Sequence, residues 1–464
     1  MKTAIASRSR SEKESIRIAS GQGYWGDLPQ APYWQVSKGP IDYLVMDYLA
    51  EVTMSILQKQ KSRDPKLGYA KDLLPVMEQI LPFVIDRDIK VVTNGGGVNP
   101  QACRDAIFDI ARKAGLSRLK IGVVFGDDIF GRVDELLNKG ATLKNMDSGE
   151  ELTKIRDRLQ SANVYFGAFP IAEALNDGAQ IVLTGRATDT GLTLAPMIYE
   201  FGWGENDYDK LAAGIVAGHI LECGGQSSGG NFLKDWKNVP DLANIGFPIA
   251  EAHPDGTVFI TKHDGTGGLV SVDTIKEQLL YEIGDPTEYI TPEVIADFTS
   301  IRLDQDGTDR VKVYDIKGKP PTESFKVSMA YSDGYYAIGT LTYGWPDALE
   351  KAQVADRIMR QRLEDLGYHY DEFHTEFLGY NSCHGPLSPK PSELNEVVLR
   401  VAVRGKDREA IDAFGRQLVP LVLTGPPTVT GFGGGRPKPQ DVVAYWPSLI
   451  PKSLVRPTVE VSEI

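Results

Sequence analysis

The stretch Ile89-Lys-Val-Val-Thr-Asn-Gly-Gly-Gly-Val-Asn-Pro100 joins an apolar, strand-like run to three consecutive glycines, and an alanine-rich helical pattern follows it. Strands that lead into helices in this way are typical of α/β folds. A glycine loop between a strand and a helix presents free backbone amides, and the positive end of the helix dipole, to an anion. The stretch therefore predicts an α/β domain whose loops bind a ligand.

The same pattern recurs on both sides of this stretch. Strand-like runs that end in glycine-containing loops lie at 16–20, 119–125 and 180–184. Helical spacing of apolar residues covers 71–87 and also 41–60, where Asp47 is expected on the outer side of the helix. Strands that alternate with helices predict a largely parallel, doubly wound sheet with helices on both of its faces.

The pattern changes after the middle of the chain to short runs separated by turn signals, which is typical of antiparallel strands. The C-terminal part then has the order strand, helix, strand, strand, helix, which favours a smaller α+β, ferredoxin-like domain. These five elements are expected at 335–343, 347–366, 372–380, 395–403 and 408–421. The expected divisions of the chain are a polar tail at 1–14, an α/β domain at 15–295 and the α+β domain at 296–464.

Composition narrows the class of protein. The chain has 464 residues, 42% of them apolar, and a net charge of −13. This acidity argues against binding to nucleic acid or to an anionic membrane, because such partners need a basic face. Three cysteines are too widely spaced for a zinc motif and too few for a disulfide framework, and no apolar run is long enough to span a bilayer. We expect a cytoplasmic protein without a metal or a cofactor.

A second glycine-rich stretch, Glu222-Cys-Gly-Gly-Gln-Ser-Ser-Gly-Gly-Asn231, follows an apolar helical run at 211–221. Its four glycines add no buried surface, so they are tolerated where the backbone takes a positive φ or lies against a ligand. The carboxylate, thiol, amide and hydroxyl groups between them would be costly to bury without partners. The stretch indicates the wall of a binding site, and the alternative is a plain loop with glycine at a helix end.

We expect the loops at 94–99, 185–190, 222–231 and 263–268 to meet in one cleft, because open α/β sheets bind ligands at the carboxyl ends of their strands. Acid/base chemistry there needs titratable groups in a partly dry pocket. The candidate catalytic residues are Glu222, Asp264, His263 and Asp189. The candidate substrate-binding residues are Asn94, Gly95, Gly96, Asn99, Arg186, Thr188, Gln226, Ser227, Ser228, Asn231 and Thr266.

Two of these residues have specific expected roles. Glu222 follows an apolar helical run, so burial is expected to raise its pKa towards neutrality and to make it the proton-transfer group. Arg186 follows a strand, and its guanidinium offers a bidentate fork to a carboxylate or phosphate of the ligand. The alternative role of Arg186 is a salt bridge with Asp189.

Other reactive side chains are weaker candidates. Cys223 is either a nucleophile or, like most free cysteines, a small buried apolar residue. His384 would act as an acid only if the two domains closed over one cleft. Ser227 and Ser228 lack the G-x-S-x-G context of a serine hydrolase.

From about Ile16 to Val461 the sequence resembles the family of acyclic terpene utilisation proteins related to AtuA. Six ordered motifs carry the resemblance: Ser20-Gly-Gln-Gly-Tyr-Trp-Gly-Asp27, Gly39-Pro-Ile-Asp-Tyr-Leu-Val-Met-Asp-Tyr-Leu-Ala-Glu51, Thr93-Asn-Gly-Gly-Gly-Val-Asn-Pro100, Gly185-Arg-Ala-Thr-Asp189, Glu222–Asn231 and Tyr281-Glu-Ile-Gly-Asp-Pro286. The resemblance implies a catabolic setting near branched acyl-CoA or carboxylic-acid intermediates, without an established chemistry. Many relatives carry a further C-terminal ferredoxin-fold segment that looks either missing here or encoded separately, and in the second case the resemblance implies a small partner subunit.

Two functions of different classes fit this sequence. The first is a lyase, namely a hydratase or dehydratase that acts on a branched hydroxy acid or its CoA thioester, with backbone amides holding the acyl oxygen and carboxylates moving the proton. The second is a non-catalytic ligand-binding or scaffold subunit of the same pathway. The expected partners are a small anionic ligand, such as a CoA thioester, and further copies of the chain in a homo-oligomer.

Overall fold

The computed structural model describes residues 13–431 and 433–464. By their contacts these residues form two compact units, one made of the chain up to Ala330 together with Tyr445–Ile464, and the other of Tyr331–Ala444. The expected boundary at 296 falls inside the first unit, to which the chain returns at its end. The expected polar tail at 1–14 lies outside the described residues except for Lys13 and Glu14.

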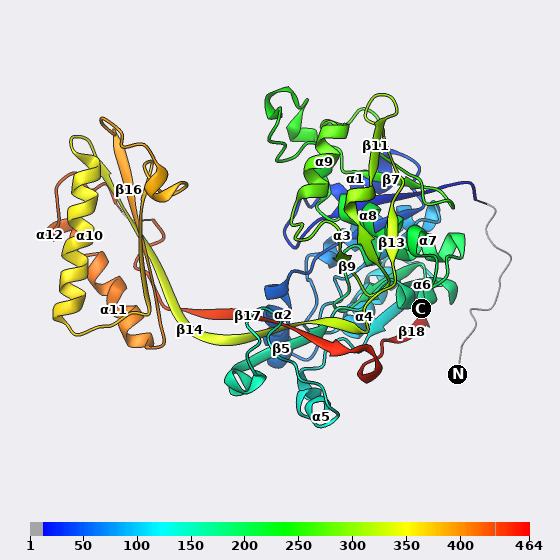
Figure 1. The fold of residues 1–464 in the computed structure, drawn as a ribbon, viewed down its shortest axis with the longest axis horizontal. Helices are drawn as coiled ribbons and strands as arrows, with labels where there is room; N and C mark the ends of the chain where they lie inside the picture. The colour runs from blue at the N-terminus through cyan, green and yellow to red at the C-terminus, as the bar shows by residue number, and fades with distance from the viewer. Residues whose placement is uncertain (1–12, 432) are drawn as a thin grey trace. The chain divides into compact units, whose positions relative to one another are not determined.

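The first unit is built on one large sheet, which has ten strands in the described part of the chain. In spatial order these are β11 (Arg302–Gln305), β12 (Val311–Tyr314), β8 (Val258–Thr261), β7 (Ile249–Ala252), β1 (Ile16–Gln22), β2 (Tyr43–Met46), β3 (Lys90–Thr93), β6 (Ile181–Thr184), β4 (Lys120–Phe125) and β18 (Thr458–Glu463). Several of these strands are labelled in Figure 1.

The centre of this sheet is parallel and its two sides are antiparallel. Strands β1, β2, β3, β6 and β4 run parallel to one another, whereas β7 is antiparallel to β1 and β18 is antiparallel to β4. The expectation of a largely parallel sheet is therefore correct only for the centre. The sheet is mixed because β7, β8, β12 and β11 continue it on one side through antiparallel pairs and β18 closes it on the other.

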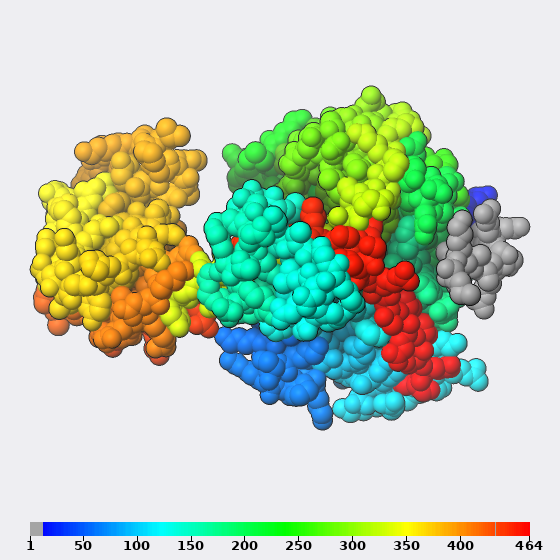
Figure 2. Space-filling model, turned by 60° about the horizontal axis from the view of Figure 1, so that its bottom comes forward, coloured from blue at the N-terminus to red at the C-terminus, as the bar shows by residue number. Residues whose placement is uncertain are grey.

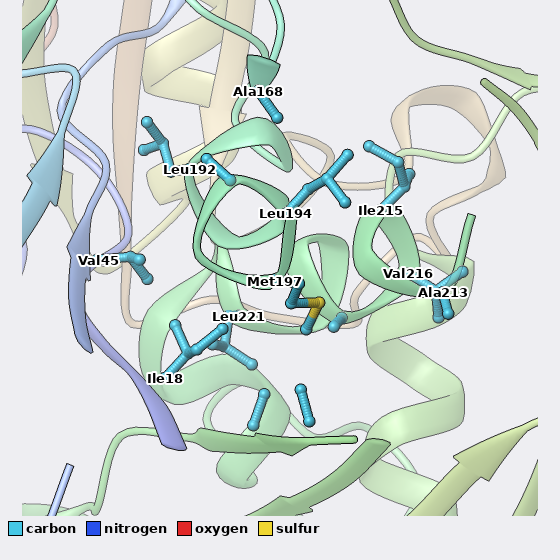
Figure 3. Packing of buried hydrophobic residues seen from close by; sticks show 14 of the residues in the cluster. Ile18, Val45, Ala168, Leu192, Leu194, Met197, Ala213, Ile215, Val216 and Leu221 are labelled. Atoms are coloured by element: carbon cyan, nitrogen blue, oxygen red, sulfur yellow. The ribbon is translucent and has the colours of Figure 1, made fainter. Parts of the chain in front are cut away.

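Helices cover both faces of the sheet, as the alternation of strands and helices predicts. One face packs against α6 (Phe169–Asn176), α7 (Gly191–Phe201) and α8 (Tyr208–Leu221), and the other packs against α1 (Ala31–Lys38), α2 (Glu51–Arg63), α3 (Leu73–Asp86) and α4 (Pro100–Lys113). Successive residues of β2 alternate between the two apolar clusters, with Tyr43 and Val45 in one and Leu44 and Met46 in the other. Figure 3 shows the first cluster, where side chains from β1, β2, α7 and α8 meet.

The helix expected over 41–60 is wrong in its first part. Residues Tyr43–Met46 form strand β2, and helix α2 begins only at Glu51. All four residues of β2 are buried, and such a continuous apolar run fits a strand that is covered on both faces. Asp47, expected on the outer side of a helix, directly follows β2 and is only 6% exposed.

The remaining elements of the first unit are short. They are α5 (Val133–Asn138), α9 (Val272–Leu280), β5 (Leu159–Val164), which pairs with β14 (Ser324–Gly344), and the small antiparallel sheet of β13 (Lys317–Lys319), β10 (Ile295–Asp297) and β9 (Tyr289–Ile290). Strand β18 pairs with β4 near the end of the chain, and Figure 2 shows the end of the chain, drawn red, beside segments drawn cyan. None of the helices among the described residues has both the length and the apolar character needed to cross a bilayer.

The second unit has the expected order of elements. Strands β14 and β17 (Gln440–Pro451) carry the chain into and out of it, and between them lie α10 (Ala348–Asp365), β15 (Glu372–Leu378), β16 (Glu396–Gly405), α11 (Arg408–Leu418) and α12 (Leu421–Thr424). The strands are ordered β15, β16, β14, β17, and β16 is antiparallel to both of its neighbours. A core that includes Met359 of α10, Leu399 of β16 and Phe414 of α11 joins the helices to the sheet.

A close backbone contact fixes helix α8 against the turn that follows β6. A methyl group built on Gly218 of α8 would lie 2.5 Å from the backbone oxygen and 2.6 Å from the Cα atom of Thr190. Only glycine leaves room for this approach. The contact places the end of α8 beside the residues that follow the carboxyl end of β6.

We predict that Gly218→Ala destabilises the protein by roughly 1–3 kcal/mol, because the added methyl overpacks against backbone that has no rotamer to change. Helix propensity alone would make alanine more stable than glycine by about 1 kcal/mol. A loss of stability in Gly218→Ala would therefore indicate the close contact, and a gain would indicate that propensity dominates. Chemical denaturation measures it. Gly131→Ala is the control, since a methyl there meets no atom within 4 Å. A Gly218→Ala variant as stable as the wild type would contradict the contact.

Candidate functional site

The carboxyl ends of the five parallel strands lie along one edge of the large sheet. Because β1, β2, β3, β6 and β4 run in the same direction, the loops that follow them leave the sheet on the same side. Polar residues follow three of these strands directly: Asp47 after β2, Asn94 after β3 and Arg186 after Gly185 at the end of β6. All three are nearly or fully buried, at 6%, 0% and 2% exposure.

Asp47 and Asn94 form a hydrogen-bonded pair. The Asn94 Nδ2 amide donates to Asp47 Oδ1 at 2.6 Å, and Asn94 Oδ1 accepts the backbone N–H of Tyr48 at 2.7 Å. Both ends of the Asn94 amide are thereby used. Burial, and then the negative charge of Asp189, raise the pKa of Asp47 well above its usual range.

Arg186 is held by groups from three loops. Its Nη1 donates to Asp189 Oδ1 at 2.6 Å and to the backbone oxygen of Leu49 at 2.9 Å, and its guanidinium carbon lies 4.3 Å from the ring centroid of Tyr165. Burial alone would lower the pKa of Arg186, but Asp189, Tyr165 and Asp47 raise it, so the charge persists. The salt bridge with Asp189, the alternative role for Arg186, is therefore present, and the Asp189 carboxylate remains 35% exposed.

Glu222 caps the C-terminus of α8 and pairs with a histidine one turn earlier. Glu222 Oε1 lies 2.8 Å from Nδ1 of His219, whereas Glu222 Oε2 is buried and has no hydrogen-bond partner among the described residues. The side chain of Glu222 is 14% exposed. Burial raises the pKa of Glu222, the His219 ring opposes this rise and the charge of Asp189 adds to it. The carboxyl ends of α8 and β6 thus bring two carboxylates into electrostatic contact.

After Glu222, the glycine-rich stretch Glu222–Asn231 continues as a tight 3-10 turn over Gly224–Ser228. Gly224 has φ 55° and lies against Phe247 and Asp27, where a Cβ atom would be 2.8 and 2.9 Å from their side chains. Gln226 Nε2 donates to Gln278 Oε1 at 3.0 Å, and the hydroxyls of Ser227 and Ser228 are buried without a hydrogen-bond partner in the described structure.

Cys223 sits at the start of this turn. Burial raises the pKa of its thiol to about 12. At neutral pH the group is therefore a thiol and a poor nucleophile, and its side chain is only partly buried.

The residue after the loop at 263–268 contacts the Glu222–Asn231 stretch through its backbone, since Leu269 N donates to the Ser228 oxygen at 2.7 Å. The ring of His263 instead turns to α1, where Nε2 lies 3.0 Å from the Gln35 oxygen. Asp264 is exposed. Thr266 and His263 line a cavity of about 10 Å³ against α1, a volume on the order of one water molecule.

Several other expected binding residues have structural contacts. Asn99 Nδ2 donates to the backbone oxygens of Pro65 and Leu67, both at 2.8 Å. Gly95 and Gly96 allow close packing, since a Cβ atom would lie 2.9 Å from the Leu73 side chain and 2.6 Å from the Thr184 oxygen, respectively.

The last three candidates differ in burial. Thr188 has a buried hydroxyl without a partner in the described structure, Asn231 is exposed with φ 57°, and His384 is exposed in the second unit.

The structure therefore brings together Asn94, Arg186, Asp189 and Glu222, which the sequence pointed to, with residues that it did not. The additional residues are Asp47, Tyr165, His219 and Gln278. Only His219 had a usable signal, because it stands three residues before Glu222 on an expected helix and so on the same face. In the part of the chain that the structure describes, no group of three or more histidine, cysteine or acidic side chains is placed to hold a metal ion.

We predict that Arg186→Lys lowers the free energy of unfolding by roughly 1–3 kcal/mol, because an ammonium group cannot donate to Asp189 and Leu49 while stacking on Tyr165. Denaturant unfolding measures the loss. Arg132→Lys serves as the control, since Arg132 is 43% exposed and its ion pair with Glu135 lies on the surface. If Arg186→Lys were as stable as the control, the guanidinium would not be a structural centre of the site.

We predict that Asp127→Asn becomes more stable relative to the wild type as the pH rises from about 5 to about 8. Asp127 is 3% exposed, and burial raises its pKa to about 7. The folded state holds this proton more tightly than the unfolded state, so the stabilisation is complete below the ordinary pKa of 3.8 and is lost as the pH rises through about 7. Melting temperatures of both proteins across this range test it, and a difference that does not change with pH would contradict it.

Comparison with known proteins places the chain in a family. No curated protein and no solved structure gives a significant match. The family whose description is "Acyclic terpene utilisation family protein AtuA" matches residues 16–461, nearly the whole chain and both of its units. The resemblance carried by the six sequence motifs is thereby confirmed. The chain belongs to the acyclic terpene utilisation family, AtuA.

Proposed function

We propose that this protein is a lyase of acyclic terpene breakdown that adds water to, or removes it from, a branched carboxylic acid or its CoA thioester. Family membership supports the pathway. The single observation that supports the chemistry is the buried Oε2 of Glu222, which has no hydrogen-bond partner in the described part of the chain, since an unsatisfied carboxylate oxygen in a native structure calls for a partner. A substrate hydroxyl or an acidic C–H group is such a partner.

Hydration needs one proton and one hydroxide. In the forward direction water attacks the β-carbon of an α,β-unsaturated acyl group and the α-carbon gains a proton, and dehydration is the reverse. Glu222 carries the proton, because burial raises its pKa from 4.5 towards the range where it can both accept and donate. Asp189, held by Arg186, is the second carboxylate, and the hydroxyls of Ser227 and Ser228 are available donors for the acyl oxygen.

The buried charges limit the kind of substrate. Arg186 is already neutralised by Asp189, so a free carboxylate of the substrate would have to be held by backbone amides or serine hydroxyls. A neutral thioester oxygen costs less free energy to bury than a carboxylate, so backbone amides or serine hydroxyls suffice to hold it. This favours the CoA thioester over the free acid.

We infer in addition that the Tyr331–Ala444 unit is ferredoxin-like. Its elements follow the order strand, helix, strand, strand, helix, strand, which is typical of that fold. Such a unit supplies a surface for assembly, either with further copies of the chain or with a small ferredoxin-fold partner subunit.

The proposal predicts that Glu222→Gln lowers turnover at least about 100-fold while preserving the fold and ligand binding, because the amide keeps the size of the side chain and removes its titration. The assay follows the loss of enoyl-thioester absorbance, and the substrates are methyl-branched 2-enoyl and 3-hydroxyacyl groups, each as the free acid and as the CoA thioester. Calorimetry measures binding.

Glu200→Gln is the matched control. Glu200 is also buried, at 7% exposure, but it accepts a hydrogen bond from Tyr43 at the opposite, amino end of β2. The control should retain wild-type turnover. Wild-type turnover in Glu222→Gln would remove Glu222 from the chemistry. Binding without turnover by the wild-type protein would instead favour the non-catalytic, ligand-binding subunit.

A further inference from the structure

His219 is a buried histidine with both ring nitrogens in hydrogen bonds. It lies in α8, is 1% exposed and has its Nδ1 2.8 Å from Glu222 Oε1. Its Nε2 lies 3.0 Å from the backbone oxygen of Gln278 in α9. A backbone carbonyl has no proton to give, so Nε2 must carry one. The tautomer of the ring is therefore set by α9.

The contact with α9 is reciprocal and rigid. The Gln278 side chain is fully buried, and its Nε2 donates to the backbone oxygen of His219 at 2.8 Å. Its Oε1 accepts from Gln226 at 3.0 Å, which fixes the direction of the amide. Both helices thus hold the imidazole in one orientation, with Nδ1 pointing at Glu222.

The surroundings of the ring favour a positive charge. The acidic groups that act on it are Glu222 and then Glu282. The rings of Tyr289 and Phe298 have their centroids 5.7 and 5.4 Å from that of His219, and both contacts are T-shaped.

The other titratable groups nearby are neutral. Burial raises the pKa of Cys223 to about 12 and that of Tyr289 well above its usual range. Burial by itself would lower the pKa of His219, but the Glu222 carboxylate, the Gln278 carbonyl and Glu282 together outweigh it and the pKa is raised.

We propose that His219 is a positioning residue that remains doubly protonated, so that its Nδ1–H occupies Glu222 Oε1 and Glu222 exchanges its proton with the substrate at Oε2 alone. The proposal rests on the proposed role of Glu222 in the reaction. It also makes a statement about the ring that needs no substrate, because the protonation state of His219 is a property of the resting protein.

The proton balance is simple. When Glu222 accepts a proton from the substrate at Oε2, it becomes a neutral carboxylic acid, and its Oε1 continues to accept the N–H of His219 as a carbonyl oxygen. The reverse step returns the proton from Oε2. His219 loses no proton in either direction, and its charge keeps the pKa of Glu222 below the value that burial alone would give.

Nitrogen-15 NMR of histidine-labelled protein tests the protonation state directly. The chain has six histidines, and His219→Asn and His263→Asn assign the two signals of interest. His263 is the internal control, because its Nε2 also lies 3.0 Å from a backbone oxygen, that of Gln35, while its Nδ1 lies against Gly39. Burial lowers the pKa of His263.

At neutral pH we expect two imidazolium-type nitrogens for His219 and a neutral ring, protonated on Nε2, for His263. In Glu222→Gln the carboxylate is absent while the burial remains, so the pKa of His219 should fall. A neutral His219 in the wild-type protein, or a charged one whose pKa Glu222→Gln does not lower, would overturn the proposal. Neither result depends on turnover, so each stands apart from success or failure of the proposed reaction.

A second measurement separates positioning from a merely structural role. Asparagine at 219 can place an N–H near the position of Nδ1 but carries no charge, so the pKa of Glu222 should rise further in His219→Asn. In the direction in which Glu222 accepts the proton, the acidic limb of the kcat/KM profile should move up by roughly 1–3 pH units. An unmoved limb with a folded variant would overturn the positioning role.

Discussion

The ion pair of Arg186 and Asp189 is the interaction on which the carboxyl edge of the sheet depends. A guanidinium that is 2% exposed loses its hydration, and such a charge is tolerated only with partners of good geometry. These partners come from different loops: Asp189 from its own turn, the Leu49 oxygen from the loop after β2 and the Tyr165 ring from the segment after β5. The backbone N–H of Arg186 adds a bond to Asp127 after β4 at 2.8 Å. One residue therefore sets the relative positions of the loops that form the site.

Helix α8 brings Glu222, the proposed proton-transfer group, to these loops. The backbone contact of Gly218 with Thr190 places the end of the helix next to the Arg186–Asp189 turn, so that Glu222 lies within the field of Asp189. Burial and like charge act in the same direction on Glu222, and His219 acts against both. The resulting carboxyl group has one oxygen in a hydrogen bond with a histidine and one without a partner among the residues that the structure describes. This difference in hydrogen bonding between the two carboxyl oxygens of Glu222 is the feature that suggests proton transfer.

The sequence predicts where the candidate site lies in the fold better than it predicts which residues form the site. Strand, glycine loop and helix in succession fix the direction of a strand, so Asn94 and Arg186 were placed at the correct edge from local patterns alone. Asp47 was misplaced because four apolar residues followed by an acid fit one turn of a helix as well as a short buried strand, and only the sheet decides between them. The partners Gln278 and Tyr165 come from elements distant in sequence, which no local pattern reports. The sequence groups the loop at 263–268 with the site because glycine-containing loops at the carboxyl ends of strands bind ligands, whereas in the structure the His263 ring contacts Gln35 of α1.

The central claim is that Glu222 is a buried carboxyl group that exchanges a proton near neutral pH. Infrared difference spectroscopy of the wild-type protein against Glu222→Gln, followed through a pH titration, measures that protonation without any substrate. The account predicts a carboxylic-acid C=O band that is absent from the variant and disappears only as the pH rises well above 4.5, the ordinary pKa of glutamate. A Glu222 that is already ionised at or below this ordinary value would contradict the account.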